Sequence, residues 1–318
     1  MNKRKDKNAQ ENKKNYNNKG LIIFKLLPIY ICILLFIYPL ETAYIKNSNS
    51  TLEKCYLSPS DSYINITHLI ITRFMVKLKR LPQFSKIINT DNFIKNGIRV
   101  MKKYLIPSLE NQTCKRFTWF LMIGEKANIT YIRNSLDFDY SFEIKVLYQK
   151  ELKEYIRNKT KNSDIFISTR IDYDDRIYYD AVNDVRKAIN INKPITLYGY
   201  NRGLYYYELN NEYYEFYNNY NNQGCMSVFI SLILNLKKVN GTYTIYDLGT
   251  HTRIRNVILK SYKSFGINKL NYEPAIFDNG DIKFIWVRQR YSGQYYYTKR
   301  IRNKLNKYKF NLKRFYGE

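Results

Sequence analysis

The sequence contains few of the residues on which many common active sites depend. Its 318 residues include two histidines and four cysteines, and no two cysteines have the C-x-x-C spacing that is typical of structural zinc sites. No P-loop, HExxH or GxSxG motif is present, and no GxGxxG follows the first predicted strand. These absences argue against a zinc module, a P-loop hydrolase, a zincin protease and an α/β-hydrolase.

Cysteine is also too scarce for a disulfide framework. Cys55, Cys114 and Cys225 follow residue 40. If that region lies in an oxidising compartment, the odd number allows at most one bridge and leaves one thiol over.

Acidic residues are scarce relative to basic ones. The chain has 53 Lys and Arg against 27 Asp and Glu, which gives a net charge of +26. A polyanion such as a nucleotide, a nucleic acid, an acidic glycan or a lipid headgroup is therefore an attractive partner, although the charge does not say which. The 45% hydrophobic content is enough to bury a core and excludes global disorder.

One long apolar run interrupts the polar N-terminal region. Leu21 to Leu40 has about the length needed to cross a bilayer, and Lys25 within it can snorkel to the interface. The basic tail over residues 1–19 precedes it and predicts a cytosolic N-terminus. The sequence thus predicts a single-pass type II membrane protein, with an anchor over residues 20–40, a stem over 41–62 and a luminal or extracytosolic domain. A cleaved signal peptide is the alternative.

Beyond residue 63, short β-rich apolar runs alternate with helical patterns, which is typical of an α/β domain with a mostly parallel central sheet flanked by helices. We expect one domain over 63–298. Strands are expected at 67–74, 117–123, 143–148, 164–171 and 195–200. Helices are expected around Ile98, Met101, Leu105 and Leu109, and over 128–136, 150–159 and 176–190.

Two further segments have unusual compositions. The tyrosine-dense stretch 204–220 predicts either a strand pair with a turn at Asn210 and Asn211 or an aromatic platform for sugars. The basic segment 299–318 predicts an amphipathic helical tail that lies outside the domain and is attracted to an anionic surface.

The densest acidic cluster follows one of these expected strands. Asp172, Asp174 and Asp175 come directly after the apolar run 164–171. Ligands of open α/β sheets bind at the carboxyl ends of the strands, so these carboxylates are expected in the binding crevice. If the alternation of a strand continues, Asp172 and Asp174 face one side and suit Mg²⁺ or Mn²⁺ together with a diphosphate. A solvated acidic turn before a helix is the alternative.

The segment 168–175, Ser-Thr-Arg-Ile-Asp-Tyr-Asp-Asp, resembles the Thr-Arg-x-Asp-x-Asp-Asp signature of the putative rhamnosyltransferase family, a branch of the GT-A glycosyltransferases. Residues 71–74, Ile-Thr-Arg-Phe, resemble the first strand of that family. Residues 105–113, Leu-Ile-Pro-Ser-Leu-Glu-Asn-Gln-Thr, followed by Trp119, resemble a third motif in the same order. The likeness covers roughly residues 67–255. Tyr173 and Arg176 depart from the pattern, so the sugar specificity is not transferred.

The resemblance implies a GT-A-like fold and a nucleotide-sugar donor. Asp172 and Asp174 would hold the ribose and the metal-bound diphosphate, and Asp175 would support them. The implied cofactor is Mn²⁺ or Mg²⁺, which neutralises charge on the departing nucleoside diphosphate. Arg73 and Arg170 are candidates for the nucleotide pocket, with surface or structural arginines as the alternative.

Five further residues are candidates for the site. His251 is expected either as a later metal or phosphate ligand, as in GT-A enzymes, or as a surface residue. Asp247 is the first candidate for a catalytic base, ahead of Glu212 and Glu273. Gly224 precedes an apolar segment that is expected to be a helix, and its backbone amide could bind the donor.

These features together predict a metal-dependent glycosyltransferase that moves a sugar from a nucleotide-diphosphate-sugar to a glycan or another hydroxyl acceptor. A non-catalytic, membrane-tethered protein that binds glycans or nucleic acid is the alternative. The basic C-terminal segment and the many aromatic residues favour nucleic acid. The predicted membrane anchor argues against it, so no nucleic acid partner is expected.

Overall fold

The protein is described here by a computed structural model, in which the chain divides into two compact units, Met1–Leu52 and Glu53–Glu318. The described residues all lie in the second unit and are 55, 64–76, 91–200, 202–217, 229–248, 275–278, 282–288, 307–309, 313 and 316. The predicted anchor over 20–40 lies outside them. Within the described ranges no helix is both long and apolar enough to cross a bilayer.

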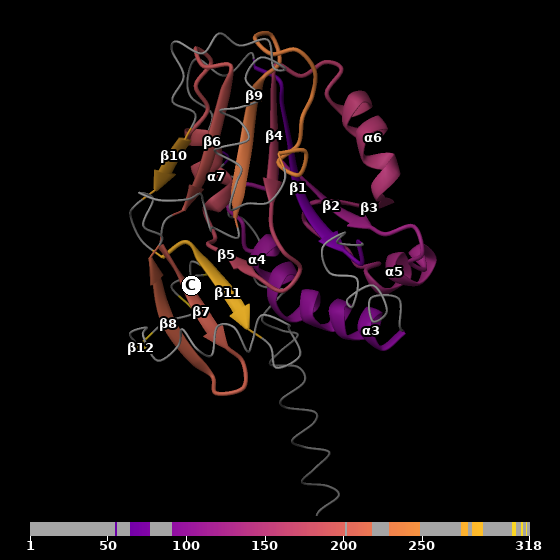
Figure 1. Ribbon diagram of the computed structural model, residues 1–318, viewed down its shortest axis with the longest axis vertical. Helices are drawn as coiled ribbons and strands as arrows, with labels where there is room; N and C mark the ends of the chain where they lie inside the picture. Colours follow the sequence, from indigo (N-terminus) through magenta and orange to yellow (C-terminus); the bar gives the residue numbers. More distant parts are fainter. Residues whose placement is uncertain are drawn as a thin grey trace, which may run out of the picture. The chain divides into compact units, whose positions relative to one another are not determined.

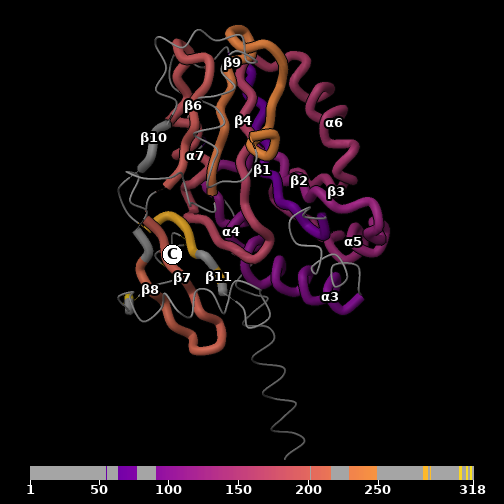
Figure 2. The backbone as a smooth tube through the Cα atoms, in the orientation of Figure 1, coloured from indigo at the N-terminus to yellow at the C-terminus, as the bar shows by residue number. Residues whose placement is uncertain are grey.

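A seven-stranded sheet forms the centre of this unit (Figure 1). Only β9 runs antiparallel to its neighbours, so the prediction of a mostly parallel sheet is confirmed. The tube in Figure 2 shows β9 lying between β4 and β6, although it follows both in the sequence. In spatial order the strands are β10 (Ala275–Asp278), β6 (Ile195–Tyr200), β9 (Ile230–Asn235), β4 (Ile165–Arg170), β1 (Ile66–Phe74), β2 (Thr118–Ile123) and β3 (Glu143–Tyr148).

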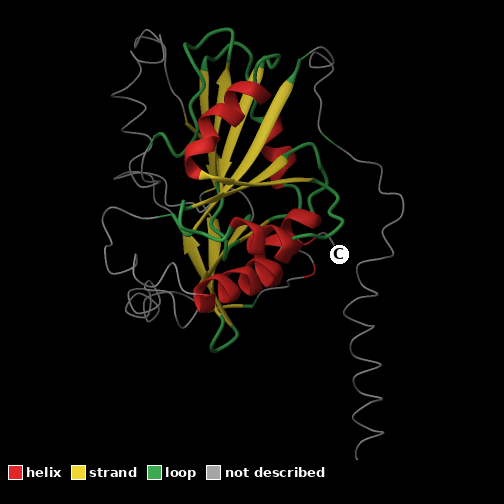
Figure 3. Cartoon of the chain, turned by 90° about the vertical axis from the view of Figure 1, so that its right-hand side faces the viewer, coloured by secondary structure: helices red, strands yellow, loops and turns green. Residues whose placement is uncertain are grey.

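Helices cover both faces of this sheet (Figure 3), which is why several of its strands, among them β4 and β9, are buried along their whole length. Ile70 faces a core formed with α3, η2, α4, α5 and α7. Its neighbours Leu69 and Ile71 face the other core, formed with α6 and the turn after β9. The helices are α3 (Asp91–Val100), η2 (Met101–Leu105), α4 (Ile106–Glu110), α5 (Ile129–Ser135), η3 (Gln149–Glu151), α6 (Leu152–Lys159) and α7 (Ala181–Lys187).

A second sheet of five strands contains the predicted tyrosine-rich strand pair. The turn that joins the two strands of this pair contains Asn211, whose φ of 51° is one that asparagine tolerates better than most residues. The buried tyrosines of this pair contact one another in the core, so they do not form an exposed platform for sugars. In spatial order the strands are β12 (Lys307–Tyr308), β8 (Glu212–Tyr217), β7 (Arg202–Tyr207), β11 (Phe284–Arg288) and β5 (Arg176–Ile177).

Two predicted helices are corrected by this pairing. The helix expected from residue 176 begins at Ala181, because Arg176 and Ile177 pair with β11 instead. The apolar segment after Gly224 is not a helix, because residues 230–235 form β9 in the middle of the sheet. A short run of apolar residues that is buried on both faces has no helical or strand periodicity, so the pattern could not separate the two.

The C-terminal segment is also corrected where it is described. Residues 307 and 308 form β12 and pair with β8. The ring of Tyr316 lies 5.9 Å from the guanidinium of the buried Arg176. These parts of 299–318 therefore belong to the second sheet and its core rather than to a separate tail.

A disulfide joins Cys55 to Cys114, which stands shortly before β2. The bridge closes a loop of 59 residues and ties the predicted stem to the domain. The cysteine count allowed at most one bridge in this region without indicating which two cysteines would form it. Cys225 lies outside the described residues.

A buried polar row crosses the middle of the seven-stranded sheet. Nε2 of His68 lies 2.8 Å from the hydroxyl of Thr169, which lies 2.7 Å from the hydroxyl of Ser231. His68 is 3% exposed. Burial, with a smaller contribution from the positive charge of Arg186, lowers the pKa of His68 well below its usual range. The imidazole is therefore neutral in the folded protein at neutral pH.

This depressed pKa predicts a loss of stability in mild acid. Below about pH 6.5 the unfolded chain binds a proton at His68 that the folded chain does not, so the free energy of unfolding falls as pH falls. Urea titrations between about pH 6.5 and 5 should show a slope that is up to about 1.4 kcal/mol per pH unit smaller in His68→Gln. Equal slopes in the variant and the wild type would contradict this assignment.

Candidate functional site

Two arginines lie at the carboxyl edge of the parallel strands. Arg170 is the last residue of β4, and Arg73 is the penultimate residue of β1. The strands are adjacent, with Ile71 beside Arg170 in the register. Parallel pairing therefore brings together two cations that are almost one hundred residues apart in the sequence, at the edge where α/β proteins bind ligands.

One aromatic ring contacts both arginines. The ring centroid of Tyr246 lies 4.5 Å from the guanidinium carbon of Arg73 and 5.6 Å from that of Arg170. Both distances are within the range of cation–π attraction. Burial raises the pKa of Tyr246 to about 12, and the two arginines only partly offset this effect. The hydroxyl is therefore neutral, and it donates a hydrogen bond to the carbonyl of Ile71 at 3.1 Å.

The sequence analysis missed Tyr246, although it considered its neighbour Asp247. No local pattern indicates that a tyrosine in the turn after β9 contacts the ends of β1 and β4. The turn reaches them because it returns across one face of the sheet, where the backbone N–H of Ile245 donates to the hydroxyl of Ser168 at 2.8 Å.

Asp172, the first carboxylate of the predicted motif, is paired with Arg170. Nη2 of Arg170 lies 3.1 Å from each carboxylate oxygen, and Nε lies 3.3 Å from Oδ1. The arginine side chain is 7% exposed and the aspartate side chain 31%. Burial acts to lower the pKa of Arg170, but the charge and hydrogen bonds of Asp172, together with smaller contributions from Tyr246 and Asp175, outweigh it and hold the pKa above its usual value.

The motif then turns back on itself, which corrects one step of the sequence argument. The backbone N–H of Asp175 donates to the carbonyl of Asp172 at 3.3 Å, so the segment is a turn and the alternation of a strand does not apply. Tyr173 packs its ring edge-on against Phe74, with centroids 5.4 Å apart. Asp174 remains partly exposed.

Asp175 has a different environment from the other two carboxylates. It is fully buried, and its Oδ1 accepts a hydrogen bond from the backbone N–H of Val287 at 3.1 Å. This bond connects the acidic turn to β11 of the second sheet. Sequence adjacency did not reveal that the third aspartate contacts the core of the second sheet.

The metal prediction depends on Asp172 and Asp174. Within the described ranges, no three His, Cys, Asp or Glu side chains lie close enough together to hold a metal ion among them. Mg²⁺ usually binds one or two protein carboxylates together with substrate phosphates and water, so a pair of partly exposed aspartates fits such an ion. Of the other two predicted metal ligands, Asp175 is fully buried and His251 lies outside the described residues. Gly224, which was predicted to bind the donor, also lies outside them.

Asp247, the predicted catalytic base, lies in the same turn as Tyr246 and is exposed. Its Oδ2 accepts hydrogen bonds from the backbone N–H and the hydroxyl of Thr244, at 2.8 and 2.9 Å. These bonds close the turn that carries Tyr246. Of the other base candidates, Glu212 lies at the start of β8 and its Oε2 accepts from Tyr214 at 2.7 Å. Glu273 lies outside the described residues.

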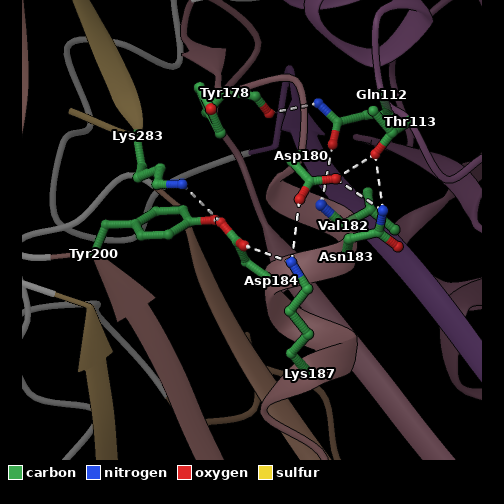
Figure 4. Close-up of polar contacts among 10 residues, drawn as sticks. All are labelled: Gln112, Thr113, Tyr178, Asp180, Val182, Asn183, Asp184, Lys187, Tyr200 and Lys283. Atoms are coloured by element: carbon green, nitrogen blue, oxygen red, sulfur yellow. Dashed lines mark hydrogen bonds and ion pairs between the residues drawn. The ribbon is translucent and has the colours of Figure 1, made fainter. Parts of the chain in front are cut away.

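A clamp of polar side chains holds the chain that follows the acidic turn (Figure 4). The buried amide of Gln112 donates to the carbonyls of Ser108 and Tyr178, both at 2.8 Å, and accepts from the backbone N–H of Val182 at 3.0 Å. The backbone N–H of Thr113 donates to the carbonyl of Tyr179 at 2.9 Å. Four hydrogen bonds thereby fix both the path from the acidic turn to α7 and the end of α4.

The acidic residues of α7 belong to the same region. Asp180 accepts from Asn183 at 2.8 Å and from the hydroxyl of Thr113, and it pairs with Lys187 (Figure 4). Asp184 accepts from the hydroxyl of Tyr200 at 3.0 Å and lies 3.3 Å from Nζ of Lys283. These partners connect α7 to β6 and to the start of β11.

An open groove of about 500 Å³ lies away from these side chains. Its lining comes from the amino ends of β1, β2 and β3, including Thr67, Thr118 and Glu143. The candidate site lies at the opposite, carboxyl edge of the same strands.

Comparison with known protein families identifies the family of this chain. The family model described as putative rhamnosyl transferase matches residues 64–259, which is more than half of the chain. The chain belongs to this family. It is a glycosyltransferase of that family, and the predicted resemblance is confirmed. A search of curated proteins found no significant match.

Solved structures show weak likeness to the transferase. The inositol-1-phosphate CTP transferase from T. maritima has a TM-score of 0.36 and 10% identity, over 76% of this chain and 98% of that one. A protein described as a putative nucleotide-diphospho-sugar transferase from Desulfovibrio desulfuricans G20 has a TM-score of 0.34 and 10% identity, over 75% and 95%. Likenesses of this strength carry no conclusion about function.

The motifs that carry the family resemblance contact one another in the transferase. The indole N–H of Trp119 donates to the hydroxyl of Thr72 at 3.0 Å, which joins the third motif to the first. Gln112, in the same third motif, holds the chain just beyond the acidic turn. The three motifs therefore form one hydrogen-bonded frame around the carboxyl edge of β1 and β4.

The clamp predicts a large effect of one substitution. Gln112→Leu removes three hydrogen bonds from a side chain that is 2% exposed and leaves buried backbone groups without partners. We expect the free energy of unfolding in urea to fall by roughly 2–4 kcal/mol. Lys187→Ala, which removes only exposed ion pairs nearby, should cost less than about 1 kcal/mol. Similar small losses in both variants would show that the clamp does not hold this chain.

Proposed function

We propose that the transferase moves a sugar from a nucleoside-diphosphate-sugar to a hydroxyl of a glycan or a related acceptor. The observation that supports this proposal is the convergence of Arg73, Arg170, Tyr246 and Asp172 at the carboxyl edge of β1 and β4. Guanidinium groups bind phosphate oxygens in pairs, so two arginines at this edge suit a diphosphate. Asp174 lies in the adjoining turn and completes the proposed donor site.

The charges of this site favour a divalent cation as cofactor. Two arginines and the two partly exposed aspartates sum to zero, so these side chains alone do not offset a diphosphate that carries about two negative charges. A bound Mg²⁺ or Mn²⁺ would supply the missing positive charge and stabilise the leaving nucleoside diphosphate. We propose Asp174 as a protein ligand of this ion, because its carboxylate is partly exposed in the turn beside the two arginines. His251 remains a further proposed ligand.

Acceptor activation also needs a proton acceptor if the reaction inverts the sugar. Asp247 remains the proposed base. In the structure it accepts two hydrogen bonds from Thr244, so it would have to exchange at least one of them for the acceptor hydroxyl.

The role of Asp174 can be tested with a control from the same chain. Asp137 and Asp139 form a second D-x-D sequence, which lies exposed before β3. Asp174→Asn should lower metal-dependent hydrolysis of the donor by about a hundredfold or more without changing the midpoint of thermal unfolding. Asp139→Asn removes the same charge and should keep full activity. Full activity in Asp174→Asn would remove this residue from the proposed site.

Donor identity is best tested with a panel of nucleoside-diphosphate-sugars and the full chain, with and without Mn²⁺. Turnover of one donor supports the proposal. Binding of a nucleotide-sugar without transfer or hydrolysis would instead favour a non-catalytic glycan-binding protein.

We further propose that residues 20–40 anchor the transferase in a membrane and that the domain lies on the luminal or extracytosolic side. The disulfide between Cys55 and Cys114 supports this location, because disulfides persist in oxidising compartments and are rare in the cytosol.

The disulfide gives a test of both stability and location. Closing a loop of 59 residues stabilises a fold by roughly 4 kcal/mol in the chain-entropy model, so Cys55→Ser with Cys114→Ser should unfold at a lower temperature than the wild type. Dithiothreitol should destabilise the wild type to the same extent and leave the double variant unchanged, with Cys225→Ser as the control. Free thiols at both positions in cells that were alkylated before lysis would contradict an oxidising location.

A further inference from the structure

We infer that Tyr246 is the positioning residue for the donor diphosphate, and that it acts by holding Arg73 in the orientation that binds a phosphate. This inference rests on the proposed function, because it concerns the donor diphosphate that is proposed to bind at the carboxyl edge of β1 and β4. It adds a residue that neither the acidic motif nor the charge pattern contains.

The ring of Tyr246 is fixed to both strands that carry the arginines. Its hydroxyl donates to the carbonyl of Ile71 on β1, and the preceding residue, Ile245, donates its N–H to Ser168 on β4. Asp247 closes the turn through Thr244. The ring therefore has a defined position before any ligand arrives.

The two arginines differ in how they are neutralised. Arg170 has a carboxylate partner in Asp172 at 3.1 Å. Arg73 is only partly buried, and its guanidinium contacts both the ring and the hydroxyl of Tyr246. The guanidinium of Arg73 thus keeps its positive charge available, while the ring limits the positions that this long side chain can adopt.

This arrangement fits a nucleoside diphosphate more closely than a single phosphate or a neutral sugar. Arg73 presents a planar fork that matches phosphate oxygens. The neighbouring Arg170–Asp172 pair extends the polar edge towards the acidic turn, where the proposed cation would bind the same diphosphate. Fixing Arg73 beforehand also reduces the side-chain entropy that is lost on binding.

The test measures binding of UDP, GDP, CDP and dTDP to the full chain by calorimetry in the presence of Mn²⁺. We expect Tyr246→Leu to weaken the binding of the preferred nucleoside diphosphate about tenfold, which corresponds to the loss of cation–π contacts at a partly buried site. Tyr246→Phe keeps the ring but loses the hydroxyl that fixes it to β1, so it should weaken binding by a smaller factor of about threefold. With the donor as substrate, Tyr246→Leu should raise KM and leave kcat nearly unchanged. Tyr243→Leu makes the same exchange in the same turn and should bind normally.

A double-mutant cycle separates positioning from a structural role. Arg73→Lys keeps the charge but loses the fork, so it should weaken binding about as much as Tyr246→Leu, and the double variant should bind no more weakly than either single variant. If the two losses add fully, or if Tyr246→Leu binds like the wild type, the inference is wrong. If Tyr246→Leu does not fold, the cycle with Tyr246→Phe decides in the same way at smaller amplitude. If the wild type binds none of the four diphosphates, the proposed function itself fails.

Discussion

The ion pair between the buried Arg170 and the partly exposed Asp172 is the interaction on which the candidate site depends. A guanidinium that is 7% exposed needs a nearby negative charge. Asp172, two residues beyond the end of β4, supplies this charge. The pair holds the start of the acidic turn against the end of the sheet. Asp174 then remains partly exposed, while Asp175 enters the core and accepts from Val287. The three aspartates of the motif therefore lie in three different environments, with Asp172 paired to an arginine, Asp174 partly exposed and Asp175 buried.

The frame around this pair extends through both sheets. Trp119 holds Thr72 on β1, Gln112 holds the chain after the acidic turn, and Tyr246 contacts the arginines of β1 and β4. Each of these side chains comes from a separate part of the chain. The site is therefore a property of the parallel pairing, because a change in the register of β1 against β4 would move the two arginines apart.

The strands of the first half were predictable, because their β-branched and apolar runs are bounded by polar segments. Residues 143–148 and 195–200 form strands with the predicted bounds. The start of the helix expected from residue 176 was wrong, because pairing of Arg176 with β11 overrides the local pattern up to Ala181. The strand β9 was also missed, since a run that is buried on both faces has no periodicity to identify it. The C-terminal segment was misplaced for a related reason, because its pairing partner, β8, lies almost one hundred residues earlier.

The sequence by itself determined the family, the mostly parallel sheet and the location of the acidic motif, because each depends on residues that are close together in the chain. Only the tertiary structure decided which aspartate is buried, that Asp247 closes a turn, and that Tyr246 lies against Arg73. The burial of Asp175 and the contact of Tyr246 with Arg73 both depend on residues more than one hundred positions apart in the sequence. Their free energy comes from burial and strand pairing, which no local pattern of residues records.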